Sequence, residues 1–125
     1  MVATGRSDFP NQLNNSLGFP GIFRGALDVR AKTITDEMCI AAARELAKVA
    51  EDHGLSEDYI IPNMDQWEVF PREAVAVGSK GIEQGVARLK APAEERFKVA
   101  EAIIKQSREE VQMLMKEKYI IDPDA

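Results

Sequence analysis

Residues 3–34 read ATGRSDFPNQLNNSLGFPGIFRGALDVRAKTI, and this stretch decides how the fold of the chain is interpreted. Residues 2–4 are at most the end of a short strand, because so short a segment forms no sheet by itself. Residues 5–12 are polar and predict a loop. Helical spacing of apolar residues follows, and Pro20 suits the first turn of a helix that continues to about Ala31. The stretch therefore predicts a loop that leads from a strand end into a helix.

The remaining sequence predicts more helix and an irregular connection in the middle. A second helix opens at Thr33 or Thr35, either of which is an acceptable N-cap, and it ends before Gly54. The strongest helical signal lies near the end of the chain, where large apolar residues recur every seven positions from Phe97. We therefore expect a mostly α chain, with further helices over residues 35–53, 73–87 and 93–118.

The composition excludes several classes of protein. The chain has 125 residues and a net charge of −5, from 16 basic and 21 acidic residues, with no run of Lys or Arg. Such a chain is a poor candidate for binding nucleic acid or an anionic membrane. No apolar run approaches the ~20 residues of a membrane span, and the start lacks the pattern of a signal peptide. We expect a cytoplasmic protein.

The residues that most often serve as nucleophiles or metal ligands are few. The single histidine, His53, lies at the predicted end of a helix, where a solvated cation suits the helix dipole. The single cysteine, Cys39, lies among small helical residues, and we interpret it as a small core residue. The chain has neither a dinucleotide-binding glycine motif after a strand nor a P-loop, and its acidic residues are scattered along helix faces. The sequence therefore predicts no catalytic residue and no metal ligand within this chain.

Asn14 and Asn15 are the most unusual polar residues, because two amides stand side by side near a predicted helix start. Each amide offers two donors and one acceptor, so the pair could bind a carboxylate. Asparagines at such a position also cap helices and satisfy local backbone groups, and on composition alone we favour capping. The spacing of Gly18, Gly21 and Gly25 indicates close helix packing rather than a phosphate cradle.

Three stretches of this sequence resemble the C-terminal portion of the prokaryotic-type malic enzymes. They are the opening run over residues 3–34, DYIIP at residues 58–62 and GVAR at residues 85–88. The resemblance covers roughly residues 2–90 in order, and the opening block is long and specific. Beyond it the chain is similar only in character, as a long charged helix.

The resemblance implies a fold and a division of the chain. Residues 1–90 would be the C-terminal part of a Rossmann-type NAD(P)-binding α/β domain, and residues 91–125 a long C-terminal helix and tail. Malic enzymes oxidatively decarboxylate L-malate to pyruvate and CO₂ with NAD or NADP and Mg²⁺ or Mn²⁺. This chain would therefore be a mostly helical segment of such an enzyme.

The resemblance also implies roles for four residues. The asparagine pair of the family corresponds to Asn14 and Asn15, which makes both substrate-binding residues. By this analogy Asn15 reaches the malate carboxylate, and Asn14 lies close to the substrate or the nicotinamide. Thr4 and Gly5 fall where a strand ends near the cofactor.

The family's catalytic Tyr and Lys, its metal-binding acids and its glycine-rich cofactor loop have no counterpart in this sequence. We therefore expect part of a malic enzyme that is inactive alone and binds neither cofactor nor metal by itself. One alternative is a small helical interaction module that forms homo-oligomers through exposed helical faces, chiefly the long helix that begins near residue 93. Another is a small binding protein that holds a carboxylate metabolite through Asn14 and Asn15. The sequence leaves open whether the parent enzyme uses NAD or NADP.

Overall fold

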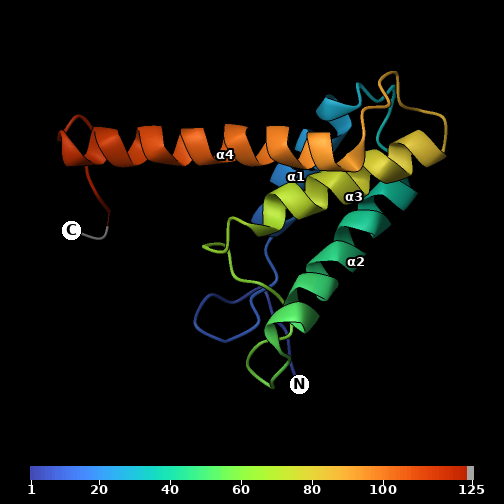
Figure 1. Cartoon of the computed structure of the whole chain (residues 1–125). Helices are drawn as coiled ribbons and strands as arrows, with labels where there is room; N and C mark the ends of the chain where they lie inside the picture. The colour runs from blue at the N-terminus through green and yellow to red at the C-terminus, as the bar shows by residue number, and fades with distance from the viewer. Residues whose placement is uncertain (124–125) are drawn as a thin grey trace.

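A computed structural model describes residues 1–123 as helices joined by loops, with no strand among these residues. Figure 1 shows three helices packed together and a fourth that extends away from them. Only isolated bridges have β character, one of them pairing Thr4 with Gln12. The expectation of a mostly α chain is confirmed. The elements in order are η1 (Asn15–Leu17), α1 (Phe19–Asp28), α2 (Asp36–His53), α3 (Val69–Glu83) and α4 (Ala93–Lys116).

Helices α1 and α3 approach each other closely because glycines of α1 lie in their contact. A Cβ on Gly25 would collide with the carbonyl oxygen of Ala74 and lie 2.8 Å from the Cβ of Val77. A Cβ on Gly21 would overlap the side chain of Glu73. Glycine at these positions lets the two backbones approach more closely than any other residue would allow. The predicted packing role is therefore confirmed for Gly21 and Gly25.

Helix α2 packs against α3 through one apolar stripe. Thr35 caps the helix, since its Oγ1 accepts from the backbone N–H of Met38 at 3.2 Å. Arg72 of α3 adds a forked contact, with 2.7 Å from Nε to Glu45 and 2.8 Å from Nη2 to Asp52. The buried residues of the stripe are Met38, Ala42, Leu46, Val49 and Ala50.

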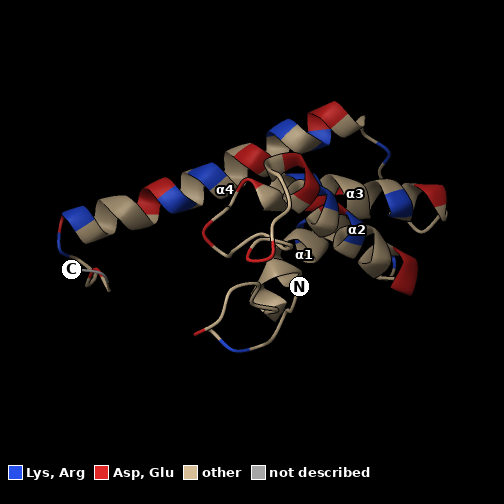
Figure 2. Ribbon diagram, turned by 90° about the horizontal axis from the view of Figure 1, so that it is seen from below, with Lys and Arg blue, Asp and Glu red and all other residues tan. Residues whose placement is uncertain are grey.

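Helix α4 is attached to the body only by its first turns. Arg96 is buried there, and its guanidinium donates to Ala91 O at 3.0 Å, Val75 O at 3.1 Å and Ser79 Oγ at 2.8 Å. Burial lowers the pKa of Arg96 from its ordinary value, and the Asp28 carboxylate partly offsets that shift. The rest of α4 projects beyond the other helices (Figure 1), and acidic and basic residues are mixed along it (Figure 2).

Glu73 is a buried acid whose carboxyl group is unpaired among the described residues. Its side chain is fully buried on α3, and neither carboxyl oxygen has a hydrogen-bond partner among the described residues. The carboxyl lies against Gly21 and Gly18, at the junction of η1 and α1. Desolvation raises the pKa of Glu73 to about 8, so the acid is mostly neutral at pH 7. The charged neighbours on the packed helices are engaged elsewhere: Arg24 with Asp28, Arg72 with Glu45 and Asp52, and Arg96 with Val75 and Ser79.

Two details of the prediction are wrong. Cys39 is exposed rather than buried, because it lies about 100° around the helix from Met38, off the stripe that faces α3. Helix α3 begins at Val69 instead of residue 73, since Pro71 falls in its first turn, where a missing N–H costs nothing. The solvated position of His53 is confirmed; its Nδ1 lies 2.9 Å from the carbonyl oxygen of Val49.

We predict that Glu73→Gln removes most of the pH dependence of stability between pH 5 and 8. The folded pKa lies above the ordinary value of 4.5, so the contribution of Glu73 to stability is greatest below that value and is lost as pH rises. The loss is about 1.4 kcal/mol per pH unit until the folded pKa is passed. Urea denaturation at several pH values measures it, with Glu109→Gln as the exposed control. A wild-type slope equal to that of the Glu73→Gln variant would contradict the prediction.

We predict that Gly25→Ala lowers the free energy of unfolding by about 1–3 kcal/mol, because the new methyl group overpacks the α1–α3 contact. Gly81→Ala is the matched control in a helix. Its Cβ would meet Met38 Cε at an ordinary 3.4 Å, and alanine favours the helix by up to about 1 kcal/mol. Thermal unfolding of both variants provides the measurement. Equal effects of the two substitutions would show that the close approach is not restrictive.

Candidate functional site

The turn that carries Asn14 and Asn15 is closed by hydrogen bonds of its own. Asn14 caps η1: its Oδ1 accepts from the backbone N–H of Ser16 at 3.0 Å and from the hydroxyl of Ser16 at 2.9 Å. The backbone N–H of Gly18 donates to the carbonyl oxygen of Asn15 at 3.0 Å. The Ser16 hydroxyl also contacts Met64 Sδ at 2.5 Å, which joins the turn to the loop before α3. Asn14 thus has the capping role that its position allowed.

Asn15 differs from its neighbour, since its side-chain amide has no hydrogen bond to any described residue of this chain. It is the first residue of η1, and its side chain is exposed. Both side chains border a hollow of about 320 Å³ whose floor is apolar, with Leu17, Leu46 and Ile61. The structure therefore presents one engaged amide and one amide available to a ligand.

Two contacts with buried residues hold the Asn14–Asn15 turn on the body of the molecule. Leu17 is buried in a cluster with Leu46, Val49 and Val69. The Glu73 carboxyl lies beneath Gly18, which ends η1 and begins α1; Oε1 is 3.9 Å from where a Cβ on Gly18 would stand. The Asn14–Asn15 turn is consequently fixed to α3 through a glycine and a buried acid.

The N-terminal loop is fastened by Asn11, which sequence reasoning missed. Asn11 is buried with φ +57, and its amide donates to Val2 O at 3.1 Å and to Glu57 O at 2.8 Å. Its Oδ1 accepts from the backbone N–H of Ile60 at 2.8 Å. Asparagine is one of the few residues that adopt a positive φ readily. This side chain therefore joins the loop after Thr4 to the segment that precedes α3.

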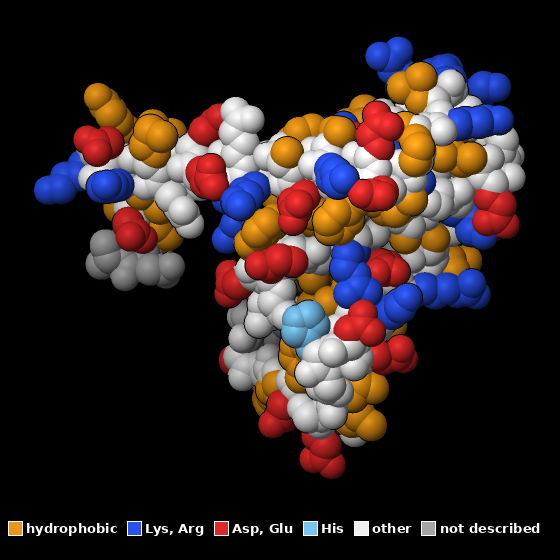
Figure 3. Space-filling view, in the orientation of Figure 1, with side chains coloured by type: hydrophobic (Ala, Val, Ile, Leu, Met, Phe, Trp, Pro, Cys, Tyr) orange, Lys and Arg blue, Asp and Glu red, His pale blue; other side chains and the backbone are white. Residues whose placement is uncertain are grey.

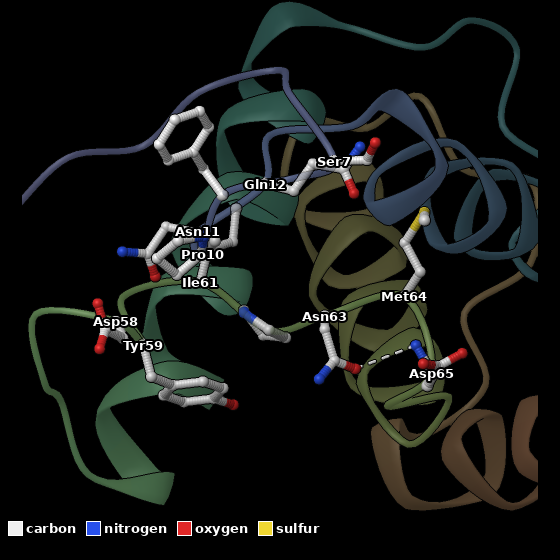
Figure 4. Close-up of a pocket in the computed structure, with 12 residues that line it drawn as sticks. Ser7, Pro10, Asn11, Gln12, Asp58, Tyr59, Ile61, Asn63, Met64 and Asp65 are labelled. Atoms are coloured by element: carbon white, nitrogen blue, oxygen red, sulfur yellow. Dashed lines mark hydrogen bonds between the residues drawn. The ribbon is translucent and has the colours of Figure 1, made fainter.

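A second hollow of about 330 Å³ lies between these two joined segments. Figure 4 shows polar side chains around its rim, including Ser7, Gln12, Asp58 and Asn63, with Tyr59 on one wall. The dashed bond joins the Asp65 backbone N–H to Asn63 Oδ1 at 3.1 Å. Neither Asn14 nor Asn15 borders this hollow.

A bidentate ion pair occupies the exposed loop beside Gly5. Arg6 Nε and Nη2 lie 2.8 Å and 2.6 Å from the two oxygens of Asp8, and the guanidinium stands over the Phe9 ring at 5.1 Å. The Arg6 contact lowers the pKa of Asp8, and Asp8 raises the pKa of Arg6. Since both groups are solvent-exposed, the pair shapes the loop more than it stabilises the fold.

Thr4 and Gly5 lie at the edge of this loop. The Thr4 backbone bonds with Asn11 O at 3.2 Å and, through its own carbonyl, with Leu13 N at 2.8 Å. A Cβ on exposed Gly5 would meet only Leu13 O, at 3.8 Å, so the residue is not a cradle that excludes a side chain. These two residues could border a cofactor but do not enclose one.

The described part of the chain does not fit a metal ion. Within residues 1–123, no three His, Cys, Asp or Glu side chains lie close enough together to hold one. A divalent cation would need ligands beyond those that the described residues supply.

No helix within residues 1–123 has the length and apolarity needed to cross a membrane.

Comparison with protein families gives a match over residues 1–81, to the family described as malic enzyme, NAD binding domain. Among curated proteins, the bifunctional malic/malolactic enzyme of Bacillus subtilis is 54% identical over 95 residues, which is 76% of this chain and 23% of that protein. The NAD-dependent malic enzyme of Geobacillus stearothermophilus is 52% identical over 88 residues, or 70% of this chain and 18% of that protein.

Two solved structures have the same fold. The malic enzyme of Entamoeba histolytica superimposes with a TM-score of 0.94 at 51% identity, over 98% of this chain and 25% of that one. The enzyme from Pyrococcus horikoshii gives 0.86 at 48% identity, over 96% and 28%. The chain therefore spans between 18% and 28% of the length of these four proteins.

We predict different effects on stability for the two asparagines. Asn14→Ala removes the cap of η1 and should lower the free energy of unfolding by about 1 kcal/mol. Asn15→Ala removes no side-chain contact among the described residues and should change it by less than about 0.5 kcal/mol. Parallel chemical denaturation of the two variants makes the comparison. The opposite order would show that Asn15 is the structural residue.

Proposed function

The chain belongs to the malic enzyme family, and from that premise we propose that it forms one wall of a malate-binding site, with Asn15 as the side chain that binds the substrate carboxylate. In the complete enzyme the site would oxidatively decarboxylate L-malate to pyruvate and CO₂. The single observation that carries the proposal is the exposed Asn15 amide, which has no partner among the described residues and stands on a turn fixed from below.

The chemistry of an amide suits this task. The two N–H donors of Asn15 can bond to a carboxylate, and a hydrogen bond to a charged group contributes about 1.5–3 kcal/mol. More of that energy contributes to binding when the donor is held in place before the substrate arrives, because less entropy is then lost. Asn14 helps to hold the turn in place, because its Oδ1 accepts hydrogen bonds from the backbone N–H and the hydroxyl of Ser16. The Asn15 amide is then available to the ligand.

Other groups of the site would come partly from this chain and partly from outside the described residues. We propose that Thr4 and Gly5 border the nicotinamide cofactor, NAD or NADP, and that residues 1–90 complete the cofactor domain. A divalent cation, Mg²⁺ or Mn²⁺, would act as a Lewis acid on the substrate oxygen. Because the described residues supply no ligand cluster for that cation, we propose that the 125-residue chain alone has no malic enzyme activity.

A second candidate function is self-association through α4. This helix projects from the body (Figure 1), and large apolar side chains are exposed along it. Apolar faces of this kind are typical of interaction surfaces. Self-association is compatible with the first proposal, since a malate-binding segment could also contribute to an oligomer. The exposed apolar residues are Val99, Ile103, Val111, Met113 and Leu114.

We predict that this chain can replace the corresponding quarter of the Entamoeba histolytica enzyme and leave it active. In that chimera Asn15→Ala should raise KM for malate by about tenfold or more, as expected for the loss of a charge-assisted hydrogen bond. The isolated chain should give no NADH or NADPH from malate and Mn²⁺. A spectrophotometric assay provides both measurements.

The control in the chimera is Gln112→Ala, which removes an exposed amide on α4. It should leave KM for malate within about twofold of the unmodified chimera, because a surface substitution away from the site has little effect. If Asn15→Ala also leaves KM unchanged in an active chimera, Asn15 does not bind the substrate. Turnover by the isolated chain would contradict the proposed division of the site.

We predict that the isolated chain associates as its concentration rises, and that Leu114→Glu weakens this association. Burying a leucine contributes about 1.5–3 kcal/mol, which a buried charge would cancel. Light scattering coupled to size exclusion compares the variant with Gln112→Glu, which adds the same charge at a polar position. A species of 13.9 kDa at every concentration would reject the second candidate.

A further inference from the structure

Four cations gather where two connecting loops meet. Arg30 and Lys32 lie between α1 and α2, and Arg88 and Lys90 lie between α3 and α4. All four are exposed, and within the described residues none forms an ion pair. Figure 3 shows Lys and Arg side chains gathered at this end of the molecule. The cluster therefore contrasts with a chain whose net charge is −5.

Backbone hydrogen bonds hold the two loops together. The N–H groups of Arg88 and Leu89 donate to the carbonyl oxygen of Val29 at 2.9 and 3.0 Å. The N–H of Lys32 donates to the carbonyl oxygen of Val86 at 2.9 Å. Arg30 and Arg88 are thus kept close to one another by the fold, although they are far apart in sequence.

Arg30 occupies a backbone position that favours glycine. Its φ is +47, in the left-handed region that ends α1, and its N–H donates to Leu27 O at 3.0 Å. Glycine is the common residue there, because a side chain is disfavoured at positive φ. A cation near the end of α1 complements the helix dipole, but this accounts for only one of the four charges. A long basic side chain in a disfavoured conformation points to a use for the guanidinium.

An apolar groove begins at the same two arginines. Arg30 and Arg88 border a hollow of about 400 Å³ together with Phe23, Leu27 and Ile34. These three apolar side chains are exposed by 53%, 65% and 39%. The groove therefore combines a cationic mouth with an apolar wall that contains one aromatic ring.

We propose that this groove binds a small phosphate monoester with an apolar or aromatic body. Guanidinium groups present paired N–H donors that match the oxygens of a phosphate, and Lys32 and Lys90 add positive charge nearby. The body of the ligand would lie on Phe23 and Leu27. The groove is independent of the proposed malate site, because it lies at the opposite end of α1, and ten residues of helix span about 15 Å.

The charge balance of the chain favours a small ligand over a nucleic acid. Four cations in one patch of an acidic chain neutralise few phosphates, whereas nucleic-acid affinity grows with the number neutralised. A ligand with one phosphate can satisfy both arginines at once. The apolar wall then decides which phosphate esters bind.

The test is calorimetry on the 125-residue chain with phenyl phosphate and with inorganic phosphate at low ionic strength. We expect phenyl phosphate to bind at least about tenfold more tightly, because only the ester reaches the apolar wall. Arg30→Gly and Arg88→Gln should each weaken that binding at least about tenfold through the loss of a charge-assisted contact. Arg44→Gln, which removes an exposed arginine on α2, should change it less than about twofold. The melting temperature of the Arg30→Gly variant should equal or exceed that of the unmodified chain, because glycine suits the positive φ. Lost binding then cannot be attributed to unfolding.

Four results would overturn the proposal. One is no detectable heat with phenyl phosphate at millimolar concentration. Another is equal binding of the two phosphates, because the apolar wall would then have no part. The third is an equal effect of Arg44→Gln, which would identify diffuse attraction by surface charge. The fourth is a short oligonucleotide that binds more tightly than phenyl phosphate, which would identify a different ligand.

Discussion

The close approach of α1 to α3 is the constraint on which the rest of this structure depends. Glycines at positions 21 and 25 remove the side chains that would keep the two helices apart. The space at Gly21 is filled by Glu73, whose carboxyl has no partner among the described residues. Burial favours the neutral acid, and a neutral acid can remain where a carboxylate would be costly. The core is therefore well packed but sensitive to the charge of one side chain.

This constraint reaches the functional site through Gly18. That glycine ends η1 and begins α1, so the turn that carries both asparagines is continuous with the helix that packs on α3. Asn14 uses its acceptor on Ser16, and Asn15 keeps its amide exposed. Two residues of the same type thus serve different purposes: the first orders the turn and the second is proposed to meet the substrate. Arg30 lies just beyond the other end of α1, so this helix separates the proposed malate site from the cationic groove.

Much of the fold could be predicted from the sequence, because local signals and tertiary packing agree in α2 and in the first turns of α4. Thr35 marks the start of α2, and the stripe from Met38 onward is the face that packs on α3. Helix α4 begins directly after Pro92, as its sequence indicates. The start of α3 was predicted too late, at residue 73. The structure includes Pro71 in the helix, because the first turn accepts a residue without an N–H.

The site was harder to predict, because its supporting residues depend on contacts between distant segments. Nothing near Asn11 in the sequence indicates that its amide bonds to Glu57 and Ile60. Glu73 has a weak signal, since Val69, Glu73 and Val77 follow one another at helical spacing and two of the three are apolar. A lone glutamate on such a row is ordinarily solvated. Only the glycines on the facing helix explain why this one is buried.

The most direct test of the account is an NMR pH titration that follows the Glu73 carboxyl carbon and the Asn15 side-chain amide in the same sample. The account predicts a midpoint near the folded pKa of about 8 for Glu73, with the Asn15 amide signals shifting at that same pH. A midpoint near the ordinary glutamate value, or Asn15 signals that stay constant through the Glu73 transition, would contradict it.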